Sequence, residues 1–298
     1  MEPWNSSPYP SSRSAADADA LNSPIQFPAA LPLEPEDREP VAQPDPDRFP
    51  PVLVVFSSSG GAGETGIVAN LSRALAAQGE DVLLLDAFLE NNLARCFGVE
   101  PPVLGAVTLV SRPGSGVRLR LAQTPVARHD PGGDGDVLFL DELAALATDC
   151  DRILIDLSTA SPLLIWQIFR LSPLLLVPIM PGWNAVLSVS LIHRLLRQVS
   201  RPDRLPVQPK FLLTQFDPEI SFHRTVRDEL RSRLGVGLLP LALHRGPALD
   251  EAFDLGMTVL DACPDGRASQ DFLALAGWIR THYHRPPREA PCAAEQAS

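Results

Sequence analysis

Short apolar runs alternate with amphipathic segments along most of this chain. Val52–Phe56, Val82–Leu85 and Ile153–Ile155 are continuously apolar, as strands buried on both faces are. Thr65–Gln78 and Val186–Val199 instead repeat their apolar residues at helical spacing. Strands that alternate with helices form βαβ units with right-handed crossovers. The sequence therefore predicts an α/β fold, a three-layer sandwich with a mostly parallel central sheet.

The same alternation continues almost to the end of the chain. Further strands are expected at Val117–Leu121, Leu174–Val177, Phe211–Leu213 and Leu238–Leu241. Further helices are expected near Leu138–Ala147, Phe222–Leu234, Ala248–Leu255 and Ser269–Tyr283. Ligands of such sheets bind outside the carboxyl ends of the strands, so we expect a site in the loops there.

The two ends of the chain differ from the middle. The first 50 residues contain 11 prolines, nine acidic residues and three arginines, so they carry −6 of the net charge of −11. A segment of this composition cannot bury enough apolar surface to offset the entropy of ordering it. We therefore expect a disordered tail over residues 1–50, a folded domain over 51–285 and a flexible tail over 286–298.

Charge and cysteine content limit the function classes. A net charge of −11 disfavours nucleic acid as a partner, because nucleic-acid-binding proteins present a basic face. The four cysteines, Cys96, Cys150, Cys263 and Cys292, form no CxxC pair, which favours free thiols over disulfides or a zinc site. The chain shows neither a leader-like segment nor about 18 consecutive apolar residues. We expect a cytoplasmic protein without direct membrane insertion.

A glycine-rich loop joins the first predicted strand to the first predicted helix. Its glycines are Gly60, Gly61, Gly63 and Gly66. Glycines let the backbone approach an anion, and a helix start presents free N–H groups and a partial positive charge. Two later strands end in carboxylates, Asp86 and Asp156. This pattern predicts a phosphate-binding site; a plain structural turn, with the two aspartates as loop caps, is the alternative.

The loop and its surroundings resemble the ParA/MinD-type P-loop ATPases, whose deviant Walker A loop reads Lys-Gly-Gly-x-Gly-Lys-Thr-Thr. Asp151–Leu157 resembles their Walker B strand. Within that family, Leu85–Leu93, Leu239–Arg245 and Leu273–Trp278 resemble the BcsQ (YhjQ) group, which are accessory proteins of bacterial cellulose synthesis. The resemblance covers residues 51–284.

This resemblance implies a nucleotide site and a set of partners. The implied cofactor-binding positions are Gly60, Gly61, Gly63, Glu64, Thr65, Gly66, Asp86 and Asp156, with Thr65 and Asp156 as Mg²⁺ ligands if a nucleotide binds. The implied role is that of an accessory or localisation factor for cellulose synthesis. Its partners would be a second copy, through the P-loop face, and the cellulose synthase complex or its accessory proteins. An ATP-dependent switch or partitioning ATPase is the alternative.

The chain departs from the family pattern at both lysines of the loop. Ser59 and Glu64 stand there, and the single lysine, Lys210, begins a later strand. A unit charge about 4 Å from a phosphate charge interacts by roughly 4 kcal/mol at an effective dielectric of about 20. Replacing attraction by repulsion therefore weakens binding by several orders of magnitude. Glu64 could reduce this penalty by turning outward, by protonation or by pairing with an arginine.

Two further family positions have changed. Phe88 replaces the carboxylate that would position water, and Thr214 stands where the family has the asparagine that reads adenine. Phosphoryl transfer depends on electrostatic clamping of the phosphate oxygens. We therefore predict that hydrolysis is lost, that ATP and Mg²⁺ bind weakly, and that the chain has no catalytic residue.

Overall fold

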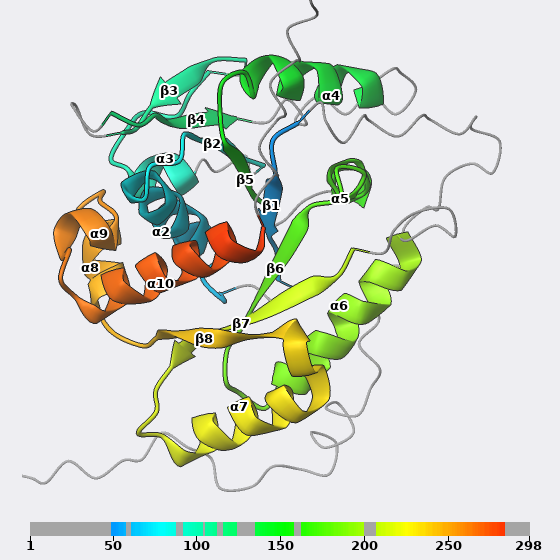
Figure 1. Cartoon of the computed structure of the whole chain (residues 1–298), viewed down its shortest axis with the longest axis vertical. Helices are drawn as coiled ribbons and strands as arrows, with labels where there is room; N and C mark the ends of the chain where they lie inside the picture. Colours follow the sequence, from blue (N-terminus) through cyan, green and yellow to red (C-terminus); the bar gives the residue numbers. More distant parts are fainter. Residues whose placement is uncertain are drawn as a thin grey trace, which may run out of the picture. The chain divides into compact units, whose positions relative to one another are not determined.

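In the computed structural model, one eight-stranded sheet has the order β3-β4-β2-β5-β1-β6-β7-β8 (Figure 1). The strands are β1 (Val52–Val55), β2 (Val82–Asp86), β3 (Val107–Leu109), β4 (Leu119–Gln123), β5 (Arg152–Asp156), β6 (Leu174–Ile179), β7 (Pro209–Phe216) and β8 (Leu238–His244). All neighbouring strands run parallel except β3, which is antiparallel to β4. The prediction of a mostly parallel sheet is confirmed.

The structure describes residues 49–57, 61–87, 92–103, 105–111, 116–123, 135–157, 162–199 and 207–283. All of these belong to one compact unit, Gln43–Ser298. The predicted tails, residues 1–50 and 286–298, lie outside the described residues except for Phe49 and Pro50. Phe49 is buried in the core, so the folded part begins slightly before residue 51.

Helices cover both faces of the sheet. One face carries α2 (Glu64–Ala77), α3 (Asn92–Cys96), α8 (Ala248–Asp254), α9 (Val259–Ala262) and α10 (Arg267–His282). The other carries α4 (Gly135–Leu146), α5 (Pro162–Phe169), α6 (Ala185–Val199) and α7 (Ser221–Leu234). A single 3-10 turn, Gly235–Gly237, joins α7 to β8. The three-layer prediction is therefore confirmed.

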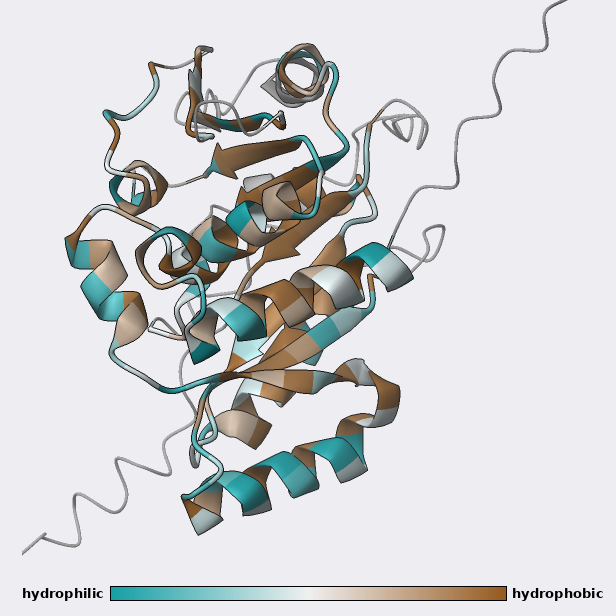
Figure 2. Cartoon of the chain, turned by 60° about the vertical axis from the view of Figure 1, so that its left-hand side comes forward, coloured by the Kyte–Doolittle hydropathy of each residue, from teal (hydrophilic) through white to brown (hydrophobic). Residues whose placement is uncertain are grey.

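The strands bury both of their faces. In β1, Leu53 and Val55 belong to one core, whereas Val52 and Val54 belong to the core on the opposite face. Figure 2 accordingly shows the central strands coloured mainly as hydrophobic. Burial on both faces explains why these segments read as continuous apolar runs instead of alternating patterns.

Four short elements were not predicted from the sequence, namely β3, α3, α5 and α9. β3 has three residues and α9 has four, too few for a helical or strand period to be visible. β8 also extends beyond its predicted end at Leu241 to His244, which places its last residues at the edge where a site is expected. Within the described residues, no helix is both long enough and apolar enough to cross a membrane.

Candidate functional site

The described end of the loop between β1 and α2 has two glycines in a left-handed conformation. Gly61 and Gly63 have φ angles of 85° and 88°, in the left-handed region that favours glycine. Gly63 is the N-cap of α2, and its carbonyl accepts the Ile67 N–H at 2.8 Å. A Cβ atom at either glycine would meet nothing within 4 Å, so conformation and not crowding requires glycine here. Gly60 and Ser59 lie outside the described residues.

Glu64 is the first residue of α2, and its side chain turns inward. The residue is 6% exposed, and its Oε1 accepts a hydrogen bond from Ser57 Oγ at 2.5 Å across the base of the loop. No arginine in the described part of the chain pairs with it. The N-terminus of a helix favours a negative charge, and Glu64 places a carboxylate in this first turn. In the described structure Glu64 therefore neither turns outward nor pairs with an arginine.

Thr65 and Asp156 meet at the carboxyl end of β5. Thr65 Oγ1 donates a hydrogen bond to Asp156 Oδ2 at 2.6 Å, and Asp156 is 0% exposed. Hydroxyl and carboxylate oxygens are hard ligands of the kind that Mg²⁺ prefers, with substrate phosphates and water completing its octahedron. This pair therefore fits the Mg²⁺ of a nucleotide complex. The described residues contain no cluster of three or more His, Cys, Asp or Glu side chains that would hold a metal without a nucleotide.

Asp86 lies beside this pair. Its Cα is in register with that of Asp156 on the neighbouring strand, and the side chain is buried. Asp86 Oδ2 accepts the Leu93 N–H at 3.1 Å, which ties the end of β2 to the start of α3. Burial, and then the nearby Asp156 and Asp86 carboxylates, raise the pKa of Cys96 to about 12. The structure thus brings Asp86 to the predicted edge, where it also acts as a loop cap.

A cavity of about 600 Å³ adjoins the loop on the side of β7 and β8. It extends from Gly63 and Gly66 to Thr214 at the end of β7 and Arg245 just after β8. Its remaining walls come from α3, α8 and α10. This volume lies within the range of about 300–1,000 Å³ that is typical of small-molecule sites.

Two polar groups at this cavity lack partners. Thr214 is 3% exposed, and its Oγ1 is buried without a hydrogen-bond partner in the described part of the chain. Buried hydroxyl groups are nearly always hydrogen-bonded, so this one suits a ligand. Arg245 is exposed, and its backbone N–H donates to Phe216 O at 3.0 Å, but no ion pair holds its guanidinium within the described residues.

The structure collects the predicted positions at one edge of the sheet. Those that it describes are Gly61, Gly63, Glu64, Thr65, Gly66, Asp86 and Asp156, whereas Gly60 and Phe88 lie outside the described residues. Lys210 is at the opposite end of β7, where its Nζ donates to Val236 O at 3.1 Å, so it serves no phosphate here.

Sequence reasoning missed Asn70 and Arg245 as site residues. Asn70 Nδ2 donates to Gly66 O at 2.8 Å, and its Oδ1 accepts the Val259 N–H at 2.7 Å, so it joins the start of α2 to α9. No spacing in the sequence predicts a contact between residues 189 positions apart. Arg245 was missed because the predicted strand ended at Leu241, whereas β8 extends to His244 and places Arg245 directly after the strand.

The two sides of this site fit a nucleotide differently. The Thr65–Asp156 pair suits Mg²⁺, and the cavity suits a base and ribose. Around the described part of the loop, however, a buried carboxylate stands where a cation is needed to hold phosphates. The residues present therefore do not fit a tightly held triphosphate.

Comparison with known proteins supports this interpretation of the fold. No family model matches the chain. The chromosome partitioning protein ParA of Caulobacter vibrioides is 27% identical over 254 residues, which cover 76% of this chain and 92% of ParA. An uncharacterised protein of Pseudomonas putida is 24% identical over 257 residues, which cover 80% of this chain and 98% of that protein.

Solved structures agree with this relation. The MinD cell division protein of Aquifex aeolicus has a TM-score of 0.60 and 20% identity, and the match covers 80% of this chain and all of MinD. The septum site-determining protein MinD of Pyrococcus horikoshii, complexed with Mg-ADP, has a TM-score of 0.59 and 20% identity. This match covers 78% of this chain and 96% of that MinD chain. The chain has the ParA/MinD fold. Together with the sequence relatives, these matches support a relation to the ParA/MinD-type P-loop ATPases.

Proposed function

We propose that this chain is a ParA/MinD-type protein with a degenerate nucleotide site, which binds Mg-ATP weakly and does not hydrolyse it. The observation that carries the proposal is Glu64. Its buried carboxylate is hydrogen-bonded to Ser57 in the first turn of α2, where phosphate-binding members of the fold need positive charge. A transition state with charge spread over phosphate oxygens gains nothing from a carboxylate there.

A phosphate-release assay on the full chain with Mg-ATP tests this proposal. We expect release at the rate of a blank without protein. Asp156→Asn is the matched control, because it removes the carboxylate that would bind Mg²⁺; wild type and control should be indistinguishable. Turnover by the wild type that Asp156→Asn abolishes would overturn the proposal.

The proposed dimer through the P-loop face has its own structural support. Trp183 follows β6, is 87% exposed and packs on Phe222 with ring centroids 4.7 Å apart. Met180, Leu187 and Ile220 are also exposed. The residues next to the ends of β6 and β7 lie at the same edge as the loop, because these strands run parallel to β1. Exposed aromatic clusters of this kind mark interaction surfaces.

Light scattering after size exclusion tests the dimer. We expect the wild type to have twice the mass of one chain and Trp183→Glu to be monomeric. Leu255→Glu is the control, because Leu255 is exposed at 68% and follows α8 instead of β6. A monomeric wild type would contradict the proposal.

The cellular role that we propose is that of an accessory or localisation factor for bacterial cellulose synthesis, acting with the synthase complex or its accessory proteins. This part rests on the resemblance of the Leu85–Leu93 and Leu239–Arg245 segments to the BcsQ group. Deleting the gene should reduce cellulose output and leave chromosome and plasmid segregation normal. Normal cellulose with a segregation defect would overturn this role.

An ATP-dependent partitioning switch is the second candidate. It is favoured by the 27% identity to ParA and by the retained Thr65–Asp156 pair and cavity. In this case a partner's arginine would supply the missing charge in trans. The net charge of −11 argues against DNA as the cargo of such a switch.

A further inference from the structure

The edge strand β8 is irregular in its middle. Its register with β7 passes from Phe211 opposite Leu238 to Leu213 opposite Ala242, so a step of two residues on β7 matches a step of four on β8. Pro240 lies in this stretch, is exposed and has no N–H to donate. Bulges and prolines weaken the pairing of an edge strand with another strand. Strand addition is therefore disfavoured in the middle of this edge.

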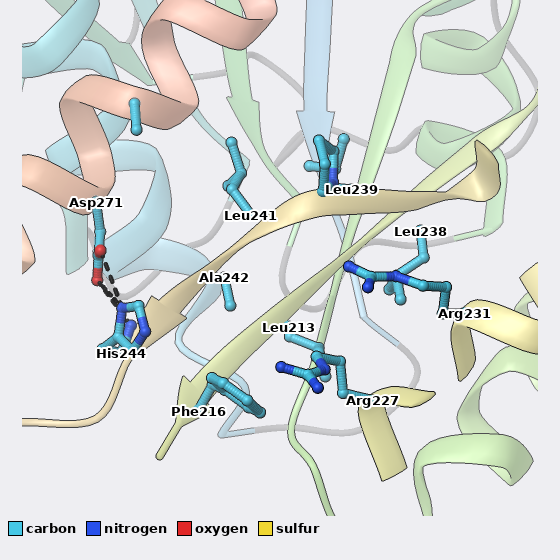
Figure 3. Close-up of a pocket in the computed structure, with 12 residues that line it drawn as sticks. Leu213, Phe216, Arg227, Arg231, Leu238, Leu239, Leu241, Ala242, His244 and Asp271 are labelled. Carbon is cyan, nitrogen blue, oxygen red and sulfur yellow. Dashed lines mark hydrogen bonds and ion pairs between the residues drawn. The ribbon is translucent and has the colours of Figure 1, made fainter. Parts of the chain in front are cut away.

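The bulge leaves a cavity of about 270 Å³ that α7 and α10 flank (Figure 3). Its apolar lining includes Leu213, Phe216, Leu238, Leu239, Leu241 and Ala242. The volume falls just below the range of about 300–1,000 Å³ found for small-molecule sites. It suits one or two inserted side chains better than a nucleotide.

Two arginines of α7 line one end of this cavity. Arg227 and Arg231 are four residues apart and so lie on the same side of the helix (Figure 3). Arg227 pairs with Asp228 at 2.9 Å and lies 5.6 Å from the centroid of the Phe216 ring. The guanidinium of Arg231 makes no hydrogen bond or ion pair with any residue that the structure describes. Arg231 therefore presents a free cation at an apolar cavity.

The opposite end carries a carboxylate that is already hydrogen-bonded. Asp271 Oδ2 accepts the His244 backbone N–H at 2.8 Å, and both carboxylate oxygens lie within 3.0 Å of His244 Nδ1. Since His244 occupies both oxygens of Asp271, this carboxylate is not directed at the arginine end. The charged groups left to bind a ligand are therefore the arginines at the other end.

We propose that this cavity, which we call the β8 pocket, docks a short segment of a partner protein with an acidic side chain next to an apolar one. The carboxylate binds Arg231, with Arg227 beside it, and the apolar side chain enters the leucine-lined space. Charge complementarity selects an acidic segment, and the irregular edge with Pro240 disfavours docking by strand addition. The proposal rests on α7, β8 and α10, so it does not depend on nucleotide binding.

Fluorescence anisotropy on the full chain tests this proposal with a fluorescein-labelled octapeptide of alternating glutamate and leucine. We expect saturable binding that Arg231→Ala weakens about tenfold, because hydrogen bonds between charged groups are the strong ones. Arg233→Ala is the matched control. Arg233 lies on the same helix and is exposed, but it pairs with Glu229 at 2.5 Å and does not line the pocket. It should change the affinity less than about twofold.

Two further variants separate a specific site from diffuse attraction. Arg231→Glu should lose the glutamate peptide and gain affinity for a lysine–leucine peptide. Ala274→Trp should weaken binding by filling the pocket from the exposed side of α10. Absence of binding by the wild type, or equal losses in Arg231→Ala and Arg233→Ala, would overturn the proposal. Tighter binding of a DNA duplex through Arg231 would also overturn it.

Discussion

The two sides of the candidate nucleotide site differ in how well they suit a nucleotide. On the base side, the cavity of about 600 Å³ is open, and Thr214 and Arg245 present groups without partners in the described structure. On the phosphate side, Glu64 is buried against Ser57, and the negative charge stands where a cation is needed. The candidate site therefore combines an open cavity beside the loop with a carboxylate at the start of α2.

This difference shows which parts of the site the fold itself requires. Gly63 shapes the start of α2, and the Thr65–Asp156 hydrogen bond joins α2 to β5, so both serve the fold without any ligand. A lysine in the loop would serve only phosphate. The fold alone therefore requires Gly63 and Asp156 but no lysine in this loop.

Asn70 should show the largest effect on stability, because it holds the base side together. Asn70→Ala leaves the buried Val259 N–H without its acceptor and should lower the free energy of unfolding by about 2 kcal/mol. Gln78→Ala is the control at the C-cap of the same helix. The amide of Gln78 donates to Leu273 O but is partly exposed, so its loss should cost under about 1 kcal/mol. Urea titration of both variants measures the difference in the free energy of unfolding. Equal losses in the two variants would show that the hydrogen bonds of Asn70 stabilise the protein no more than that of Gln78.

Gly63 should come next, because its backbone is left-handed. Gly63→Ala should destabilise the protein by about 1–2 kcal/mol, since an L side chain is strained at a φ of 88°. Gly66→Ala is the control, because Gly66 lies in the first turn of α2 with nothing within 4 Å of its added Cβ. It should be neutral or stabilising by up to about 1 kcal/mol. The same urea titration compares the two variants. An unchanged free energy of unfolding in Gly63→Ala would mean that Gly63 is not held in a left-handed conformation.

Thr214 should show a smaller effect of opposite sign. Thr214→Val removes a buried hydroxyl without a partner, so it should leave stability unchanged or raise it by up to about 1 kcal/mol. Thr258→Val should instead destabilise, because the buried Thr258 hydroxyl donates to Asp261 Oδ2 at 2.9 Å. Thermal melts compare the two. A marked loss in Thr214→Val would show that its hydroxyl is already satisfied, and the base side would no longer be built for a ligand.

The smallest expected effect concerns Cys96, which also lines the cavity. With a pKa raised to about 12, the thiol stays protonated at pH 8, and only a thiolate reacts quickly with iodoacetamide. Cys96 should therefore remain unlabelled in the native protein while the exposed Cys263 is labelled, as peptide mass mapping would report. Rapid labelling of Cys96 in native buffer would mean that the site opens far more than the structure indicates.

Much of the fold followed from the sequence, because strands buried on both faces and long amphipathic helices leave strong local patterns. The glycine loop and the carboxylates at the ends of β2 and β5 were also predicted, because they are local features of the sequence next to those strands. On the base side only Thr214 was expected from the sequence. Asn70 and Arg245 were not, because they come from distant segments that meet only after folding. The inward turn of Glu64 was also not predictable, since it depends on Ser57 across the loop. Short elements such as α9 give too few residues for a period.

Isothermal titration of Mg-ATP into the wild type, Glu64→Gln and Glu64→Lys tests the central claim most directly. We predict weak or absent binding by the wild type and an intermediate result for Glu64→Gln, which keeps an acceptor for Ser57 but removes the charge. Glu64→Lys should bind at least about tenfold more tightly, because even a discounted reversal of charge exceeds ~1.4 kcal/mol. Submicromolar affinity in the wild type, left unchanged or weakened by Glu64→Lys, would contradict the account.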